Sequence, residues 1–123
     1  MKVNFSAVLI GVKNIEKSKV FYENVLGVNF DEVRPPFSNF YLNGIEFMME
    51  ENTPEREDNW EQKYIGRNTG ICLQVEDIKK FLDNIINNGG KIVQDLKQKP
   101  WGTIEAKFSD LDDNIFIVEQ EIN

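Results

Sequence analysis

The spacing of apolar residues changes along this chain, and each spacing predicts a type of element. Residues 5–12 form an apolar, partly β-branched run, which predicts a strand. After Asn14, a residue type that caps helices, apolar residues recur at helical spacing until Gly27, a residue type that ends helices. The face of this helix expected to be buried carries Ile15, Ser18, Phe21, Tyr22 and Val25.

Three further strands are expected before the middle of the chain, at residues 29–34, 37–42 and 45–51. The prolines at 35 and 36 separate the first two, and an Asn43–Gly44 pair predicts a tight hairpin turn between the last two. The first part of the chain is therefore predicted to be a βαβββ module.

The same order recurs at a constant distance. Val12 matches Val75, Asn14 matches Asp77 and Gly27 matches Gly90, each pair being 63 residues apart. The second helix is expected to bury Ile78, Phe81, Leu82 and Ile85 and to close at Gly89 and Gly90. Its flanking strands are expected at 69–75, 91–97, 103–109 and 114–121. The sequence thus predicts two tandem βαβββ modules.

A chain of 123 residues fits one domain. We expect a single domain over 1–123, with module one at 1–51, a linker at 52–68 and module two at 69–123. Two modules of this size are expected to share one core, and neither is expected to fold alone. The polar linker is long for a compact domain and is a candidate lid.

Composition narrows the class of protein. With 41% hydrophobic and 28% charged residues, the chain is expected to be soluble, and no apolar run reaches the roughly 18 residues that a membrane helix needs. A net charge of −7 argues against nucleic acid as a partner, because affinity for phosphate backbones comes from Lys and Arg. The single cysteine, Cys72, excludes an internal disulfide and fits a cytoplasmic location.

Two motifs, placed in this modular order, resemble the vicinal oxygen chelate superfamily, which includes glyoxalase I, bleomycin resistance proteins and extradiol dioxygenases. One is the run FYENVLG at 21–27, and the other is the turn DLDDN at 110–114, where relatives usually carry Asp, Pro, Asp, Gly, Asn. The resemblance covers nearly the whole chain. It implies an α+β fold in which the two modules form a cupped mixed sheet with helices on the outer face, and it implies a homodimer.

Catalytic members of this superfamily hold a divalent metal with His and Glu side chains from four strands, but this chain contains no histidine. The resemblance places the four ligand positions at Ala7, Met48, Gly70 and Ile117, and none of these side chains can coordinate such a metal. A shift of two residues along a strand would substitute Glu46 or Glu50 for Met48, and Glu119 for Ile117. We therefore expect no metal and no other cofactor, with an all-carboxylate site as the alternative.

The residues expected to line a ligand cleft follow from strand alternation on the same placement, because residues two apart share a face. Trp101 and Trp60 are expected at the cleft mouth, where an aromatic ring beside carboxylates attracts cationic or planar aromatic ligands. Arg34 and Arg67 would clamp an anionic group if they lay at the cleft. The predicted lining residues are Phe5, Met48, Glu50, Cys72, Ile117 and Glu119, together with the two tryptophans.

Each lining residue also has a simpler interpretation. The glutamates are more often solvated strand residues than ligand anchors, and tryptophan and methionine are ordinary packing residues. Cys72 is expected to be an inert core thiol, because no histidine is present to generate a thiolate.

The leading hypothesis is a metal-free protein that binds and sequesters a cationic or planar aromatic small molecule, as in antibiotic resistance, and that is not an enzyme. One alternative is a metal-dependent lyase or dioxygenase that uses carboxylate ligands. A second is a non-enzymatic regulatory or interaction module.

Overall fold

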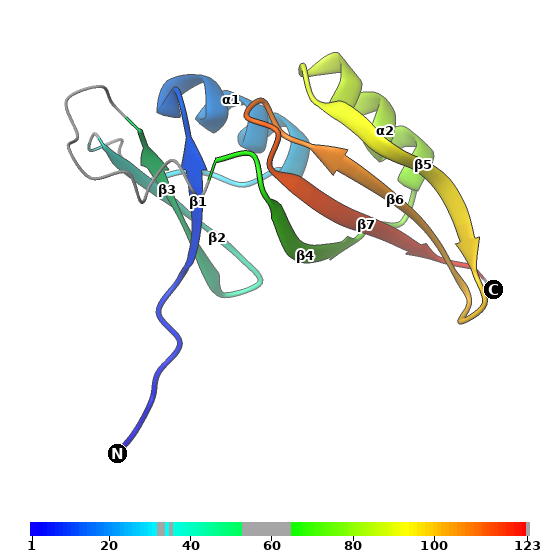
Figure 1. Cartoon of the computed structure of the whole chain (residues 1–123), viewed down its shortest axis with the longest axis horizontal. Coiled ribbons are helices and arrows are strands. Elements are labelled where there is room, and N and C mark those ends of the chain that lie inside the picture. Colours follow the sequence, from blue (N-terminus) through cyan, green and yellow to red (C-terminus); the bar gives the residue numbers. More distant parts are fainter. Residues whose placement is uncertain (32–33, 35, 53–64, 123) are drawn as a thin grey trace. The chain divides into compact units, whose positions relative to one another are not determined.

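The computed structural model describes residues 1–31, 34, 36–52 and 65–122. The chain divides into two compact units, Met1–Ile65 and Gly66–Asn123. In the described residues each unit contains one helix and one sheet, and both units begin with a strand and a helix that are followed by further strands (Figure 1). The fold is therefore α+β, with a tandem repeat of one module, as the sequence predicts.

The first unit contains a three-stranded sheet in the order β1-β3-β2. Strand β1 runs parallel to β3, and β2 runs antiparallel to β3. Its elements are β1 (Val8–Val12), α1 (Ile15–Leu26), β2 (Phe37–Leu42) and β3 (Ile45–Glu51).

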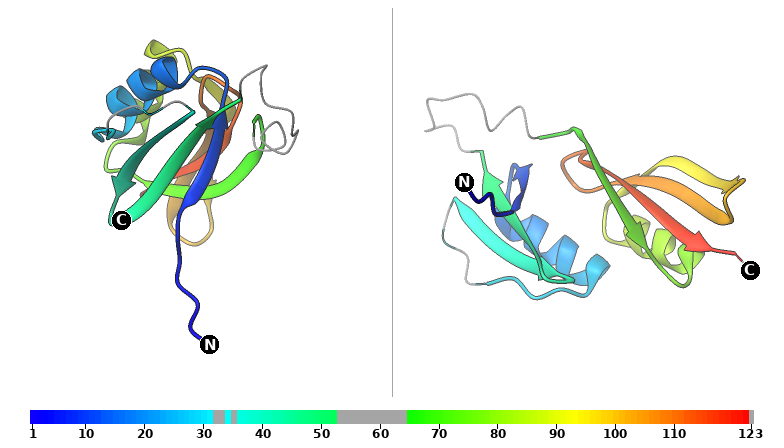
Figure 2. Two further views of the ribbon diagram at one scale, coloured as in Figure 1. Left: turned by 90° about the vertical axis from the view of Figure 1, so that its left-hand side faces the viewer. Right: turned by 90° about the horizontal axis from the view of Figure 1, so that it is seen from below.

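The second unit contains a four-stranded sheet in the order β4-β7-β6-β5. Its first strand again runs parallel to its last strand, and the other neighbours are antiparallel. Its elements are β4 (Asn68–Gln74), α2 (Ile78–Asn87), β5 (Lys91–Lys99), β6 (Thr103–Ser109) and β7 (Ile115–Glu121). In both units the helix lies along one face of its own sheet (Figure 2).

Helix α1 forms where the sequence predicts it. The side chain of Asn14 accepts a hydrogen bond from the backbone N–H of Lys17, and Gly27 ends the helix with a left-handed φ of 69°. The buried residues are Ile15, Ser18, Phe21, Tyr22 and Val25, which confirms the predicted face.

Helix α2 is capped in the same way, since the Asp77 side chain accepts from the N–H of Lys80. Ile78, Leu82 and Ile85 are buried as predicted, while Phe81 is half-buried. The cap at the carboxyl end is Asn88, and the N–H of Gly90 then reaches back 2.9 Å to the carbonyl of Ile85.

A second cap ties each helix to the last strand of its own unit. The N–H of Ile15 donates to a carboxylate oxygen of Glu51 at 2.8 Å, and the N–H of Ile78 donates to the side-chain oxygen of Gln120 at 2.9 Å. Ile15 and Ile78 are 63 residues apart, so the repeat extends to this long-range contact. Both contacts satisfy a helix N–H that has no partner within the helix.

Aromatic stacking organises the core of the first unit. The ring of Phe40 lies 4.9 Å from Phe47, 4.8 Å from Phe30 and 5.8 Å from Tyr22, measured between ring centroids. The predicted Asn43–Gly44 turn closes the β2–β3 hairpin with φ values of 52° and 79°, which are those of a turn with two left-handed residues.

Two predicted strands differ from the structure. The strand predicted at 29–34 is not formed in the described part of that segment, where only Arg34 makes an isolated bridge, to Phe37. Prolines at 35 and 36 lack the N–H groups that a ladder needs. The strand predicted at 5–12 begins only at Val8, so Phe5 lies outside it with its side chain 73% exposed. The other strands match the prediction within one or two residues at each end.

Among the described residues, no helix combines the length and the apolar content needed to cross a membrane.

Candidate functional site

The sheet of the first unit has two chemically different faces. Phe47 and Met49 on β3 are buried on the face that carries α1. Met48 lies between them in sequence and so points to the opposite face, where it pairs with Leu9 on β1 and Asn39 on β2. This alternation puts Leu9, Met48 and Asn39 on the face opposite α1. It leaves the face without the helix free to hold side chains around a pocket.

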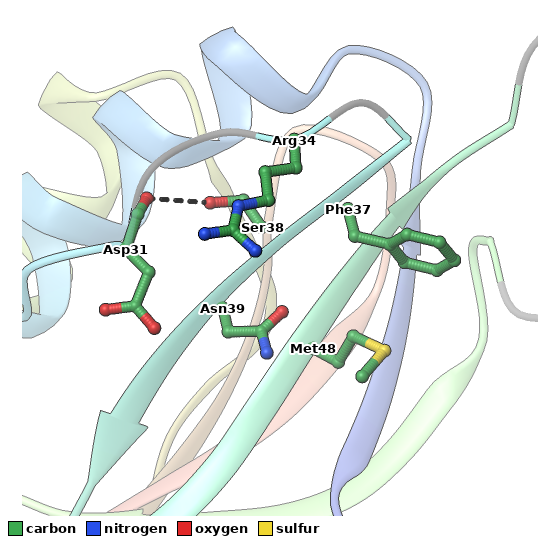
Figure 3. A pocket seen from close by; sticks show the side chains of 6 residues that line it. All are labelled: Asp31, Arg34, Phe37, Ser38, Asn39 and Met48. Atoms are coloured by element: carbon green, nitrogen blue, oxygen red, sulfur yellow. Dashed lines mark hydrogen bonds between the residues drawn. The ribbon is translucent and has the colours of Figure 1, made fainter.

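A pocket of about 580 Å³ lies on this unit (Figure 3). Two of its residues, Phe37 and Met48, supply apolar surface. The others supply a guanidinium, a carboxylate, an amide and a hydroxyl. The lining residues are Asp31, Arg34, Phe37, Ser38, Asn39 and Met48.

Backbone hydrogen bonds fix the charged residues of the pocket against β2. The N–H of Arg34 donates to the carbonyl of Phe37 at 2.8 Å, and the N–H of Phe37 donates back at 2.7 Å. The N–H of Asp31 donates to the carbonyl of Asn39 at 2.8 Å, and the Ser38 hydroxyl donates to the carbonyl of Asp31 at 3.2 Å. Both charged side chains therefore start from anchored backbone positions.

A carboxylate beside the pocket orients the amide. Glu46 accepts hydrogen bonds from Asn39 Nδ2 and from the Tyr41 hydroxyl, both at 2.9 Å. The hydrogen bond to Glu46, and then the negative charge of Glu46, raise the pKa of Tyr41 above its ordinary value of 10.0. Because one N–H of Asn39 is engaged by Glu46, the amide is oriented and its oxygen can accept a hydrogen bond in the pocket.

The predicted lining residues of the first unit have three different positions in the structure. Met48 lines the pocket. Phe5 does not lie on the strand as predicted, because β1 starts three residues later. Glu50 was expected to be a solvated strand residue or a ligand anchor, but it is only 2% exposed. It sits on the central strand β3, where it pairs with Gly11 on β1 and Phe37 on β2.

The predicted lining residues of the second unit lie on two adjacent strands. Cys72 on β4 pairs with Ile117 on β7, and Glu119, two residues further on, pairs with Glu105 on β6. Cys72 is exposed, so the prediction of a core thiol was wrong. Its strand is the edge of the sheet, and its partner Ile117 lies between the buried Phe116 and Val118, so the Cys72 side chain points away from the buried face of this sheet.

Burial of the Cys72 thiol raises its pKa, and the charges of Glu119 and Glu105 and a hydrogen bond to Glu119 raise it further. A raised pKa disfavours the thiolate, the form in which a cysteine acts as a nucleophile. Partial burial of the thiol, followed by the negative charge beside it, therefore gives the expectation of an inert thiol a physical basis.

Trp101 lies in the turn between β5 and β6 and is 67% exposed. The Lys99 ammonium lies 5.6 Å from the centre of its ring and 3.8 Å from a carboxylate oxygen of Glu105. This geometry is a cation–π contact within the chain. Trp60, the other predicted aromatic, lies outside the described residues, as does most of the candidate lid at 52–68.

The pocket contains residues that the sequence analysis missed, namely Asp31, Phe37, Ser38 and Asn39. A signal for Asn39 was present. A two-residue turn at Asn43–Gly44 sets Leu42 opposite Ile45, and counting back along both strands sets Asn39 opposite Met48. No comparable signal places Asp31, because the chain before β2 is irregular.

The four positions at which the resemblance implies metal ligands lie in pairs. Ala7 and Met48 belong to the first unit, and Gly70 and Ile117 belong to the second. None of these side chains is a His, carboxylate or thiolate donor. In the described ranges of the chain, no three His, Cys, Asp or Glu side chains are grouped so that they would hold a metal ion. The donor set therefore does not fit the metal of the superfamily.

Comparison with family models gives a match over residues 5–123 to the Glyoxalase-like domain. Comparison with curated proteins gives no match.

Three solved structures illustrate the similarity of fold. The fosfomycin resistance protein FosX from Listeria monocytogenes, complexed with Mn(II) and sulfate, has a TM-score of 0.74 at 15% identity, covering 98% of this chain and 92% of that chain. A glyoxalase/bleomycin resistance protein/dioxygenase family enzyme from Burkholderia phytofirmans PsJN has a TM-score of 0.74 at 15% identity, covering 95% and 98%. The hypothetical protein SA1046 from S. aureus has a TM-score of 0.71 at 21% identity, covering 96% and 97%. At these identities the similarity shows the fold alone.

Proposed function

Because this chain belongs to the Glyoxalase-like domain family, within the vicinal oxygen chelate superfamily, we propose that it binds a small organic molecule without a resident metal ion. Binding takes place in the pocket of the first unit, and the protein acts by sequestering its ligand, as a resistance protein of the bleomycin type would.

The pocket carries this proposal. Its volume of about 580 Å³ falls in the range of roughly 300 to 1,000 Å³ typical of small-molecule sites. It combines the Phe37 ring and the Met48 thioether with a few polar groups, which is the usual composition of such sites. Apolar area supplies most of the affinity in a site of this kind, at about 25 cal/mol per Å² buried, and the polar groups select the ligand.

The donor chemistry supports a metal-independent site. Met48 occupies the position from which a relative's metal ligand would project, and a thioether is a poor ligand for Mn²⁺, Mg²⁺ or Zn²⁺. One of the two alternative donors on the same strand, Glu46, already accepts hydrogen bonds from Asn39 and Tyr41.

The preference for a planar aromatic ligand, expected from the sequence, is supported at this pocket by Phe37. The ring of Trp101 was expected to provide that surface, but Lys99 already lies near one side of it. We therefore assign the main stacking contact to Phe37 and keep Trp101 as a comparison in the test.

The test is a thermal-shift screen of small aromatic compounds, cationic, neutral and anionic, followed by titration calorimetry of the hits with and without a chelator. We expect a hit to raise the Tm, since a ligand that binds only the folded state stabilises it. Phe37→Ala should weaken binding about tenfold or more, because it removes the main apolar wall.

Val20→Ala, an exposed residue of α1, is the matched control and should leave the affinity unchanged. A chelator should also leave the affinity unchanged. A screen without hits would favour the interaction-module alternative, and an affinity lost on chelation would favour the metal-dependent enzyme. Weakening by Trp101→Ala but not by Phe37→Ala would move the site to the second unit.

A further inference from the structure

The pocket of the first unit holds two opposite charges that do not neutralise each other. Arg34 and Asp31 both line it, and both are exposed. Within the described residues, neither the Arg34 guanidinium nor the Asp31 carboxylate takes part in an ion pair, whereas Lys91 pairs with Asp113 and Lys99 with Glu105. Each charge is therefore available to a ligand.

The third polar group has a fixed direction. Asn39 Nδ2 donates to Glu46 at 2.9 Å, so the amide is held with its oxygen free to accept. Figure 3 shows this oxygen on the side nearer Arg34 and Phe37, and the nitrogen on the far side. The pocket thus offers one fork of donors, from Arg34, and two acceptors, from Asp31 and Asn39.

Apolar surface completes the arrangement. Asn39 pairs with Met48 across the strands, and Phe37 lies two residues before Asn39 on β2, so these side chains share a face. A ligand group lying on the Phe37 ring and the Met48 thioether is therefore next to the polar groups. The pocket therefore favours a ligand that has an anionic end, a cationic or N–H end and an apolar side.

We infer that the ligand of this pocket is a zwitterion of the amino-acid type with an apolar side chain, an inference that rests on the proposed function. Its carboxylate lies on the Arg34 guanidinium, which presents two parallel N–H donors to a planar anion. Its ammonium donates to Asp31 and to the Asn39 oxygen, and its side chain lies on Phe37 and Met48. A ligand with only one charge would leave the other protein charge partly desolvated without a partner, which costs affinity.

Three probes that share a phenyl ring separate these contributions in titration calorimetry at pH 7. L-phenylalanine carries both charges, 2-phenylethylamine carries only the ammonium, and 3-phenylpropionate carries only the carboxylate. L-phenylalanine is expected to bind at least about tenfold more tightly than either of the others, because a hydrogen bond to a charged group is worth about that factor or more.

Two variants separate the contribution of the Arg34 charge from that of the Asp31 charge. Arg34→Gln should weaken L-phenylalanine and 3-phenylpropionate about tenfold and leave 2-phenylethylamine unchanged. Asp31→Asn should weaken L-phenylalanine and 2-phenylethylamine and leave 3-phenylpropionate unchanged. Lys17→Gln and Glu16→Gln, exposed charges on α1, are the matched controls and should change none of the three affinities.

Equal affinities for the three probes would overturn the inference that the ligand is a zwitterion. Affinities that neither Arg34→Gln nor Asp31→Asn changes would overturn it as well. If Phe37→Ala still weakened those probes, or weakened a different hit from the screen, the small-molecule site would stand and only the ligand class would be wrong. If Phe37→Ala weakened the binding of no ligand at all, both the zwitterion inference and the proposed binding in this pocket would be wrong.

Discussion

The thiol of Cys72 shows how neighbouring charge controls a single residue. Burial of the thiol, followed by the negative charges of Glu119 and Glu105, raises its pKa. At neutral pH the protonated form is therefore favoured more strongly than in an ordinary exposed cysteine. An exposed position would otherwise suggest ready alkylation, so the two properties make opposite predictions.

We expect Cys72 to react with iodoacetamide at pH 7.5 more slowly than free glutathione does, since the thiolate is the reacting form. Glu119→Gln should speed the reaction several-fold, because it removes one charge that raises the pKa, and each pKa unit is worth about tenfold in thiolate. Glu76→Gln, an exposed residue of the same unit, is the control. Mass spectrometry gives the rates, and equal rates in both variants would contradict the assigned cause.

Tyr41 provides a pH-dependent prediction for the first unit. Its hydroxyl donates to Glu46, and this raises its folded-state pKa above 10.0. The hydrogen bond is therefore fully present below pH 10 and is lost as pH rises through the raised pKa. Absorbance at 295 nm, with Tyr41→Phe subtracted, should show ionisation above pH 10, and Glu46→Gln should lower the midpoint. A midpoint that Glu46→Gln leaves unchanged would show that the hydrogen bond does not form.

The turn between β6 and β7 shows what a polar residue contributes to an element. Asp110 is 2% exposed, and its carboxylate accepts from the N–H groups of Asp112 and Asn114 at 2.9 Å and from Asn114 Nδ2 at 3.0 Å. Asn114 in turn accepts from the N–H of Gly66 at 3.0 Å. The turn thus joins the β6–β7 hairpin to the residues that lead into β4.

Asp110→Ala should lower the free energy of unfolding by about 2 to 4 kcal/mol, because three hydrogen-bond donors lose a charged acceptor in a buried turn. Asp113→Gly is the matched control on the same turn. Asp113 has a left-handed φ of 63°, and its ion pair with Lys91 is largely exposed, so glycine should be neutral or slightly stabilising. Urea unfolding measures both, and similar losses would mean that the turn tolerates neither change.

The elements were largely predictable because their signals are local. Periodicity and caps placed both helices, and the predicted buried side of α1 was correct at all five positions. The strand predicted at 29–34 was wrong because the types of residue in a segment do not show whether its backbone N–H groups find partners. The placement of Phe5 was wrong for a related reason, since an apolar, β-branched run predicts a strand whether or not a neighbouring strand pairs with all of it within the chain.

The pocket was less predictable because it depends on which strands are neighbours. Met48 was predicted from the family resemblance and strand alternation, and Asn39 follows from the hairpin register. Asp31 and Arg34 reach the pocket through hydrogen bonds between irregular chain and β2. No spacing rule predicts such contacts, and the alternation of residues along β3 likewise did not predict the burial of Glu50.

At the scale of the whole chain, the repeat shows how two similar units acquired different chemistry. In the first unit, Leu9, Met48 and Asn39 form one row across three strands. In the second unit the corresponding row is Cys72, Ile117 and Lys107, and Cys72 stands 63 residues after Leu9. The same positions therefore hold an amide that can orient a ligand in one unit and a cation in the other. This difference supports assigning the ligand pocket to the first unit.

The segment before β1 leads to a prediction about assembly. Residues 1–7 alternate between apolar Met1, Val3 and Phe5 and polar residues, a pattern typical of a half-buried strand, yet all three apolar side chains are strongly exposed. The segment continues into β1, which is an edge strand of its sheet. Exposed apolar area costs about 25 cal/mol per Å², and an unpaired edge is a template for pairing with another chain.

We therefore expect a homodimer in which a second copy covers this segment. Size-exclusion chromatography with light scattering should give twice the chain mass of 14.3 kDa. The double variant Val3→Ser and Phe5→Ser should shift the mass toward a single chain, because it removes the apolar face of the segment, whereas Asn4→Ala on the polar face should not. A single-chain mass for the unaltered protein at micromolar concentration would rule out the dimer. A double variant that stayed dimeric would place the interface elsewhere on the chain.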